Sequence, residues 1–354
     1  MTTELNFSFD WNYLHEKPEV EAVLKATPED FVVIENLGFE PSGQGEHIYL
    51  YVRKKGENTA WVAKKLAEFC QLPVSAISWA GLKDRHAVTE QWFGIHLPGK
   101  IELDFTQFQS ETIQIIKYCR HHKKLRPGDL RGNHFTIRLH EIEQSRALDL
   151  RLEKISQIGV PNYFGMQRFG REGNNLQQAE LLFSGKRIRE HHKRAIYLSA
   201  ARSYVFNHVV SQRVASNCLM IPFMGDCLIS LTNQDKIIFE GHGKSSMIDL
   251  QLQYRQCVTT GPMWGRGENF QKNKALDWES DALSDFSGWL NSLELAGMQM
   301  DRRPALLVIN DLRWRWLNQS LELQFSLPAG CYATSVIREL IITKTVTGQD
   351  EDTD

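Results

Sequence analysis

The sequence has few of the features that mark membrane, secreted or metal-binding proteins. Its longest apolar runs are short, such as residues 305–309, whereas a membrane-spanning helix needs roughly 20 apolar residues. The N-terminus has no basic stretch followed by an apolar one, so we expect no secretory signal. The six cysteines form no C-x-x-C pair, which favours reduced thiols over disulfides or a zinc site. These absences predict a soluble protein of the cytoplasm.

Common cofactor motifs are absent as well. The glycine that a phosphate-binding loop requires is Ile238, five residues before Gly243, and the second histidine of a metalloprotease helix is replaced by Gln144. No dinucleotide-binding glycine fingerprint follows a strand pattern. The histidine doublets at 121–122 and 191–192 are interpreted as polar surface or RNA-contacting residues, because adjacent side chains diverge and cannot share one metal. The sequence therefore predicts no metal and no organic cofactor.

Neither sign of charge is in excess: 41 Lys and Arg face 43 Asp and Glu, a net charge of −2. This sum by itself argues against a nucleic-acid partner, but it hides two basic clusters, at 117–138 and 186–194. The first includes Lys123, Lys124 and Arg126, and both contain aromatic or histidine side chains. RNA phosphates need such cations, and unstacked bases need flat side chains. One such cluster could be a solvated surface, but two clusters, one in each expected domain, favour an RNA path.

The length of 354 residues suggests roughly two domains. Strand patterns dominate the first part, and helical patterns begin near residue 144. Expected strands are 31–35, 47–52, 89–97, 134–140 and 304–310; expected helices are 60–70 (after a cap at Asn58 or Thr59), 147–157, 176–183 and 194–210. We expect an irregular, Gly-rich stretch at 259–273, a strand–turn–helix unit at 321–342 and a disordered acidic tail at 350–354. This order predicts one α/β domain carrying an inserted second domain.

The most unusual stretch is 77–95, in which Asp84 lies in a polar turn between two apolar strand patterns. Lys83 and Arg85 flank it, and they would favour its ionised form if both cations converge on it. A carboxylate held in an apolar site can act as a nucleophile or a base. An aspartate that only closes a hairpin turn also explains the spacing. Spacing alone favours this second explanation.

Around Asp84 the chain resembles the tRNA pseudouridine synthase D family. The resemblance rests on residues 80–91 (AGLKDRHAVTEQ), and four more blocks follow the family's order along the chain. These are 25–31 (KATPEDF), 132–135 (GNHF), 160–170 (VPNYFGMQRFG) and 327–338 (LPAGCYATSVIR). The resemblance extends over nearly the whole chain.

This resemblance implies an α/β (α+β) fold: a pseudouridine synthase core with a mixed, mostly antiparallel sheet and flanking helices, plus a family-specific inserted α/β domain. The core would comprise residues 1–159 and 305–354, and the insertion residues 160–304. The implied activity is isomerisation of a uridine in tRNA, at position 13, to pseudouridine. The target base would be flipped out of its stem into a pocket. The resemblance implies tRNA as partner, no metal or organic cofactor, and a monomer.

The resemblance also assigns site residues. Asp84 would be the catalytic carboxylate, and whether it attacks the sugar, adds to the base or forms a glycal stays open. Phe31 would pack against the base, Asn133 would bind the uracil edge, and Phe135 and Tyr332 would supply further rings, although the family pattern has Phe where this chain has Tyr332. Further residues expected near the substrate are Lys25 (at a phosphate), Arg85, and Gln167 and Arg168, which could be purely structural. The alternative function is a non-catalytic RNA-binding protein or tRNA chaperone.

Overall fold

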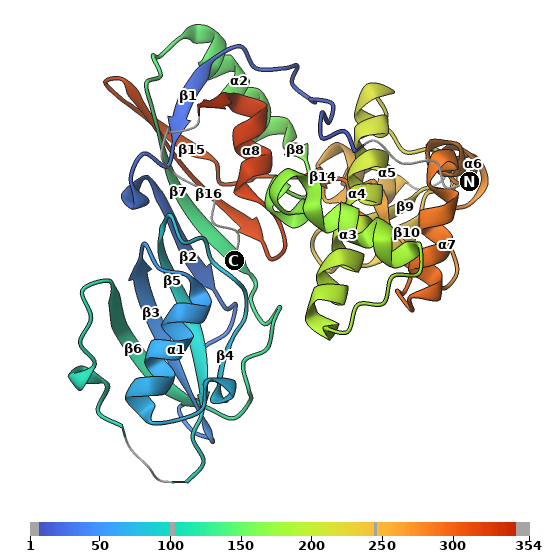
Figure 1. Cartoon of the computed structure of the whole chain (residues 1–354). Helices are drawn as coiled ribbons and strands as arrows, with labels where there is room; N and C mark the ends of the chain where they lie inside the picture. Colours follow the sequence, from blue (N-terminus) through green and yellow to red (C-terminus); the bar gives the residue numbers. More distant parts are fainter. Residues whose placement is uncertain (1–6, 100–102, 244–245, 345–354) are drawn as a thin grey trace.

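The computed structural model describes residues 7–99, 103–243 and 246–344, which form two lobes (Figure 1). The first lobe is built on a large sheet with three helices, and the second contains five helices and three small sheets. The chain enters the second lobe after α2 and returns to the first lobe at β15, so strands from both ends of the sequence share the large sheet.

The large sheet has ten strands, and its main path runs β15-β16-β7-β2-β5-β3-β6. The strands are β1 (Glu21–Leu24), β2 (Phe31–Asn36), β3 (His47–Lys55), β4 (Ile77–Trp79), β5 (Val88–His96), β6 (Ile113–His121), β7 (Gly132–His140), β15 (Arg313–Leu317), β16 (Ser320–Pro328) and β17 (Ile342–Lys344). Only the pairs β1–β17 and β2–β5 are parallel. The sheet is thus mixed and mostly antiparallel, as the sequence predicts.

One half of this sheet is covered by α1 (Thr59–Cys70). The helix starts where the Asn58 side chain accepts a hydrogen bond from the Trp61 backbone at 2.7 Å, which satisfies a free N–H of the first turn. Its apolar face, including Val62 and Leu66, packs on the inward residues of β3 and β5. Of the two expected caps, Asn58 is the observed one.

The other half of the sheet packs against α2 (Arg146–Ile158) and α8 (Ala333–Leu340). Leu152 from α2 and Ile337 from α8 share one hydrophobic core with Ile137 of β7 and Leu323 of β16. Gly132 starts β7 where a Cβ atom would come 2.2 Å from the Leu327 carbonyl oxygen of β16. Only glycine allows this approach, which gives a physical reason for the glycine in the GNHF block.

The second lobe surrounds α4 (His191–Ala215), a 25-residue helix whose middle and C-terminal parts are largely buried. Its core also takes in Trp11 from the N-terminal segment. The other helices are α3 (Asn174–Phe183), α5 (Ser246–Gln253), α6 (Asn273–Ala282) and α7 (Ser287–Leu295). The strands are β8 (Val160–Pro161), β9 (Cys227–Ser230), β10 (Lys236–Ile238), β11 (Cys257–Val258), β12 (Thr260–Met263), β13 (Asp301–Pro304) and β14 (Leu306–Leu307).

Two expectations about the second half of the chain are wrong. The stretch 259–273 is not wholly irregular, because it contains β12, which pairs with β13. The single strand expected at 304–310 is two short strands, since the chain leaves β13 at Pro304 and then pairs Leu306 and Leu307 with β8. The acidic tail lies outside the described residues. The division at 160 and 304 stays a prediction.

Candidate active site

Asp84 lies in the loop that joins β4 to β5, which pair antiparallel as expected. The loop is held from below by buried polar groups. The Lys83 backbone N–H donates to Thr59 Oγ1 at 3.0 Å, and the Gln91 side chain donates to the Gly81 carbonyl at 3.2 Å. Thr59 Oγ1 in turn donates to Gln91 Oε1 at 3.1 Å. Because these groups are buried, each lost bond would leave an unsatisfied polar atom, so the loop has one strongly preferred conformation.

Two buried lysines fix the backbone on either side of the Asp84 carboxylate. Lys83 Nζ lies 2.6 Å from Glu35 Oε2, in an ion pair whose side chains are almost fully buried. Lys54 Nζ donates to the carbonyl oxygens of Asp84, at 2.8 Å, and of Glu57, at 2.5 Å. Loss of one partner from such a buried pair is costly, because the remaining charge is left uncompensated.

The Asp84 carboxylate itself is paired with Lys25, at 2.7 Å between Oδ2 and Nζ, with 30% of the Asp84 side chain exposed. Gln167 Nε2 lies 3.5 Å from its other oxygen. Burial alone would raise the pKa of Asp84, but the charge and hydrogen bond of Lys25, together with Gln167 and Lys54, lower it below its ordinary value. The carboxylate is therefore ionised near neutral pH.

The condition under which Lys83 and Arg85 would both favour ionised Asp84, that they converge on it, is not met by Lys83. Its ammonium turns to Glu35 on the sheet, and Arg85 is exposed. The cation at the carboxylate is Lys25, which the sequence places 59 residues away. Lys25 has a left-handed backbone (φ 59°) directly after β1, a conformation that is uncommon outside glycine.

Aromatic rings from the sheet form the floor beside this ion pair. Lys25 Nζ lies 4.2 Å from the centroid of the Phe31 ring, within the range of a cation–π contact. Phe31 packs edge-on against Phe135, with centroids 6.1 Å apart, and Phe135 stacks on Phe325 of β16 at 5.5 Å. Phe31 and Phe135 are 3% and 6% exposed. The structure thus brings Phe31 beside Asp84 and places Phe135 in the core behind it.

Asn133 lies opposite Glu35 across β7 and β2, on the same face as Phe31 and Phe135. Its Oδ1 atom is buried and has no hydrogen-bond partner among the described residues. Buried amide oxygens are nearly always bonded, so this atom is available for a donor from a ligand. Asn133 is therefore a candidate for ligand contact.

The second lobe supplies the facing wall. Gln167 and Arg168 lie on the short 3-10 helix Met166–Phe169, and Arg168 donates to the Tyr332 hydroxyl at 2.8 Å and to Ser199 of α4 at 3.1 Å. Tyr332 precedes the first residue of α8. At Gly165 a Cβ atom would come 2.9 Å from Thr334 Oγ1, so glycine permits this close contact between the lobes. The site lies at the junction of the lobes.

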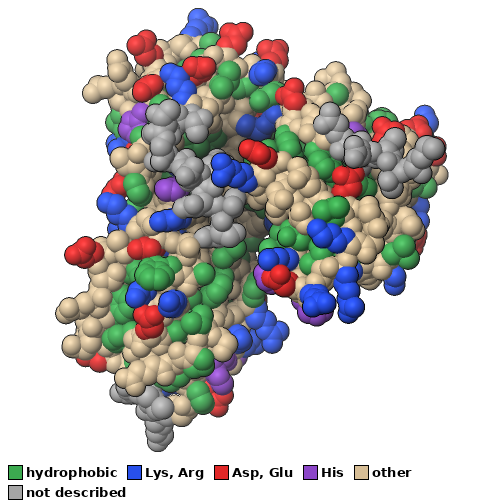
Figure 2. Space-filling model, viewed as in Figure 1, with side chains coloured by type: hydrophobic (Ala, Val, Ile, Leu, Met, Phe, Trp, Pro, Cys, Tyr) green, Lys and Arg blue, Asp and Glu red, His purple; other side chains and the backbone are tan. Residues whose placement is uncertain are grey.

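The first basic cluster lies next to the loop that carries Asp84. Lys123, Lys124 and Arg126 are exposed in the connection between β6 and β7. Leu125 anchors this connection, being fully buried in a cluster with Ala80, and the Gly128 N–H donates to the Ala80 carbonyl at 2.8 Å. Figure 2 shows Lys, Arg and His side chains on both lobes beside an open notch between them.

The interpretation of both histidine doublets as surface residues is wrong for His121. Its ring is buried, 4.7 Å from Tyr49 between centroids, and its Nδ1 accepts the Ser42 N–H at 3.0 Å. The pKa of His121 is lowered, first by burial and then by the neighbouring His122 and Lys123. His191 and His192 are exposed at the start of α4.

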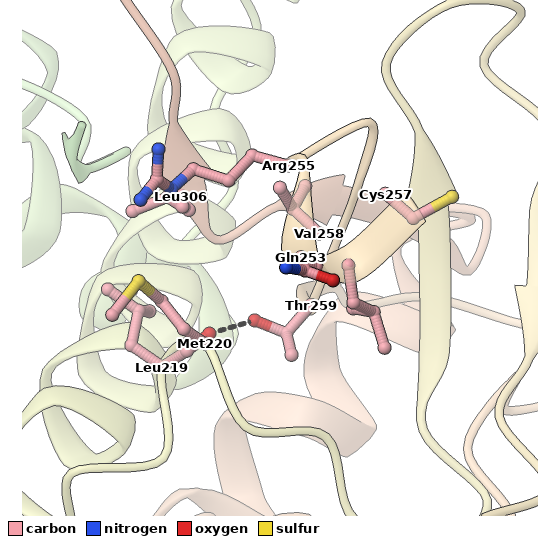
Figure 3. Close-up of a pocket in the computed structure, with 9 residues that line it drawn as sticks. Leu219, Met220, Gln253, Arg255, Cys257, Val258, Thr259 and Leu306 are labelled. Atoms are coloured by element: carbon pink, nitrogen blue, oxygen red, sulfur yellow. Dashed lines mark hydrogen bonds between the residues drawn. The ribbon is translucent and has the colours of Figure 1, made fainter. Parts of the chain in front are cut away.

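A pocket of about 150 Å³ lies away from Asp84. It lies in the second lobe (Figure 3) and is lined by Leu219, Met220, Leu252, Gln253, Arg255, Cys257, Val258, Thr259 and Leu306. The Thr259 hydroxyl donates to the Leu219 carbonyl at its wall. No residue predicted for the site lines this pocket.

Two properties of the described ranges bear on the sequence predictions. Within 7–99, 103–243 and 246–344, no three or more His, Cys, Asp or Glu side chains are grouped so that they could hold a metal ion. No helix in these ranges combines the length and the apolar character needed to cross a membrane.

Sequence reasoning missed several residues that build the site. Glu35, Lys54, Thr59 and Gln91 support the loop from three different strands and α1, and Arg303 lies beside Arg168 in the wall. One sequence feature could have revealed Lys54: it continues the inward-facing series Ile48, Leu50, Val52 of β3, and a charged residue at an inward position requires a buried partner.

Comparison with known proteins agrees with this site. The model of the family described as tRNA pseudouridine synthase D (TruD) matches residues 10–187 and 186–340. A tRNA pseudouridine synthase D from Aeromonas hydrophila is 49% identical over 93% of each chain. One from Pseudoalteromonas atlantica is 41% identical over 96% of this chain and 99% of that protein.

A solved structure shares the fold. The crystal structure of a Methanosarcina mazei protein, described as a candidate tRNA pseudouridine synthase D, superposes with a TM-score of 0.70 at 21% identity, over 94% of this chain and 96% of that one. The architecture of this chain is accordingly that of the pseudouridine synthases, a mixed α/β sheet with flanking helices. The chain belongs to the tRNA pseudouridine synthase D family.

Proposed function

We propose that this protein is a tRNA pseudouridine synthase that isomerises uridine 13 of tRNA, with Asp84 as its catalytic carboxylate. The names of its relatives, tRNA pseudouridine synthase D, support the tRNA pseudouridine synthase activity. The observation that carries the assignment to Asp84 is its ion pair with Lys25, which keeps the carboxylate ionised in a loop fixed from below. A residue that only closed a turn would not need a cation from 59 residues away.

The reaction breaks the bond between uracil N1 and the sugar C1′, turns the base and forms a C5–C1′ bond. The C5 hydrogen leaves as a proton and N1 gains one, so the reaction is a net isomerisation. An ionised Asp84 suits each of the three routes, because attack on the sugar, addition to the base and removal of a 2′ proton all need the deprotonated form.

The neighbouring residues then take positioning roles. Asn133, with its unpartnered oxygen, accepts a hydrogen bond from the uracil edge. Phe31 packs on the base once the Lys25 side chain shifts, since the ring is otherwise covered. Phe135 packs against Phe31 and supports it. Tyr332, which accepts a hydrogen bond from Arg168, forms the wall of the site opposite these rings. Arg85 lies at the exposed edge of the loop, where it meets the RNA strand.

The remaining parts of the proposal concern the whole protein. We propose that residues 1–159 and 305–354 form the catalytic domain and 160–304 the insertion, and that the protein works as a cytoplasmic monomer. The sharing of the large sheet between residues 21–140 and 313–344 supports this division. Lys123, Lys124 and Arg126 then bind tRNA phosphates from beside the catalytic loop.

Tritium release tests the proposal. Transfer RNA labelled at uridine C5 should lose tritium to water with the wild-type protein, and pseudouridine should appear at position 13 by mass mapping. We expect Asp84→Asn to reduce release by at least about 10⁴-fold while tRNA affinity stays within a few-fold. Thr106→Val, at an exposed turn, is the matched control and should keep full activity.

Three outcomes are informative. Binding without release by the wild-type protein would favour the alternative of a tRNA-binding chaperone. Release at another uridine would contradict position 13 but not the activity. A large loss of tRNA affinity in Asp84→Asn would instead show that Asp84 has a structural role.

A further inference from the structure

Two arginines at the junction of the lobes lack a negative partner. Arg168 bonds only to the Ser199 and Tyr332 hydroxyls. Arg303, from β13, bonds to the Asn162 side chain at 2.8 Å and the Gly330 carbonyl at 2.9 Å. All of these partners are neutral, and neither arginine forms an ion pair within the described residues.

Other buried arginines of this lobe are arranged differently. Arg302, next in the chain to Arg303, is bound by both oxygens of Glu279 at 2.8 Å. Arg213 is paired with Asp226, and both side chains are fully buried. The fold therefore neutralises the guanidinium groups of the fully buried Arg213 and Arg302, as the cost of burying an unpaired charge requires, whereas the partly exposed Arg202 is held by backbone carbonyls.

The two unpaired guanidinium groups lie close together. Their Cζ atoms are 5.4 Å (Arg168) and 4.2 Å (Arg303) from the centroid of the Phe164 ring. Each has a buried Nε atom without a hydrogen-bond partner. The nearby Cys331 thiol does not supply a negative charge, because burial raises its pKa despite the opposing effect of Arg303. Both side chains stay partly exposed, so a ligand can reach them.

We infer that Arg168 and Arg303 form an anion site that binds a phosphodiester group of the RNA next to the flipped nucleotide; the inference rests on the proposed function. Guanidinium groups with free N–H donors match phosphate oxygens. The site borders the catalytic carboxylate, because Gln167, adjacent to Arg168, contacts Asp84. It would fix the strand between the lobes while the base turns.

The test uses the Asp84→Asn protein, so that binding is measured without turnover. Replacing both arginines in it by Gln should weaken tRNA binding about 10- to 100-fold. The slope of log affinity against log salt should fall by about 0.7–0.9, the contribution of one phosphate. A methylphosphonate linkage replaces a charged phosphate by a neutral group. In a series of tRNAs with one such linkage each around the target uridine, one linkage should weaken binding to the Asp84→Asn protein but not to the same protein without the two arginines.

Two further variants separate charge from structure. Arg303→Lys keeps the charge and should retain the salt slope while losing several-fold in affinity. Arg202→Gln is the matched control: Arg202 is also half-buried but serves only backbone carbonyls, so its loss should leave the slope unchanged. Arg303→Lys also provides the measurement if the double variant does not fold.

The inference is overturned if every methylphosphonate weakens the parent and the arginine variant equally. A second outcome also overturns it as an RNA site. In that outcome, inorganic phosphate stabilises only proteins that have both arginines, and no methylphosphonate linkage distinguishes the two proteins. The site would then bind a free phosphate ion rather than a phosphodiester of the RNA. Failure of the wild-type protein to bind tRNA would refute the proposed function itself, whereas a loss of binding confined to Asp84→Asn would show that Asp84 has a structural role.

Discussion

At the scale of single residues, the proposed chemistry depends on how Asp84 is kept ionised. Burial raises the pKa of Asp84 and Lys25 lowers it, and the net result is a pKa below the ordinary value. The folded-state pKa is therefore lower than the unfolded one. Such a group contributes stability above its unfolded pKa and loses that contribution as the pH falls through its folded pKa.

Lys25→Gln should move the acid limb of kcat to higher pH. Without the cation, the burial that raises the pKa of Asp84 is opposed only by weaker contacts. Because Lys25 lowers the pKa of Asp84, tritium release by the variant should begin to fall, on acidification, at a higher pH than release by the wild type. Lys55→Gln, which removes a surface pair with Glu29, is the control. Identical acid limbs in wild type and Lys25→Gln would show that Lys25 does not set the charge state.

At the scale of elements, the loop between β4 and β5 depends on α1 as much as on its own strands. Thr59 is the first residue of α1 and is fully buried beneath Lys83 and Gln91. The helix cap at Asn58 thus positions a hydroxyl under the loop that carries Asp84. Asn58 and Asp84, which lie 26 positions apart in the sequence, are linked through the Thr59 hydroxyl and the Lys83 backbone.

Thr59→Val should test this link. The change keeps the shape but leaves the Lys83 N–H without its acceptor, which costs about 1–3 kcal/mol of unfolding free energy. We expect kcat to fall about 10- to 100-fold, because small misplacements of reacting groups are expensive, with little change in tRNA affinity. Thr112→Val, at an exposed hydroxyl, should cost less than about 0.5 kcal/mol. Unchanged kcat in Thr59→Val would mean that the loop does not need this support.

At the scale of the whole molecule, the near-neutral total charge coexists with local basic surfaces. The connection carrying Lys123, Lys124 and Arg126 is fixed to Ala80 by Leu125 and Gly128, so these cations lie beside the catalytic loop. The second cluster, at 186–194, precedes and begins α4 in the other lobe. An RNA strand crossing the junction could contact both.

Neutralising Lys123, Lys124 and Arg126 together to Gln should weaken tRNA binding and reduce its salt dependence. If each contacts one phosphate, the slope of log affinity against log salt should fall by about 2–3, while single-turnover kcat with saturating tRNA stays near the wild-type value. The exposed Lys64 of α1 offers a control as Lys64→Gln. An unchanged slope in the triple variant would place this connection off the RNA path.

The sequence by itself determined much of the local structure. Periodic apolar patterns located β2, β3, β5, β7, α1, α2 and α4 to within a few residues, and the blocks around Asp84 identified the family. These properties are readable because they depend on side chains close together in the chain. The position of Asp84 in a turn between paired strands followed from the same local pattern.

Only the tertiary structure decided which charges meet. Lys83, adjacent to Asp84, turns to Glu35, and distant Lys25 takes the place beside the carboxylate. The reason is geometric: neighbouring side chains in a loop diverge, whereas the folding of the sheet brings Lys25, which follows β1, and Glu35 of β2 to the loop before β5. Arg168 and Arg303 are 135 positions apart in the sequence, and both guanidinium groups lie near the Phe164 ring because of how the second lobe packs. A sequence pattern shows charges but not which of them lie close together.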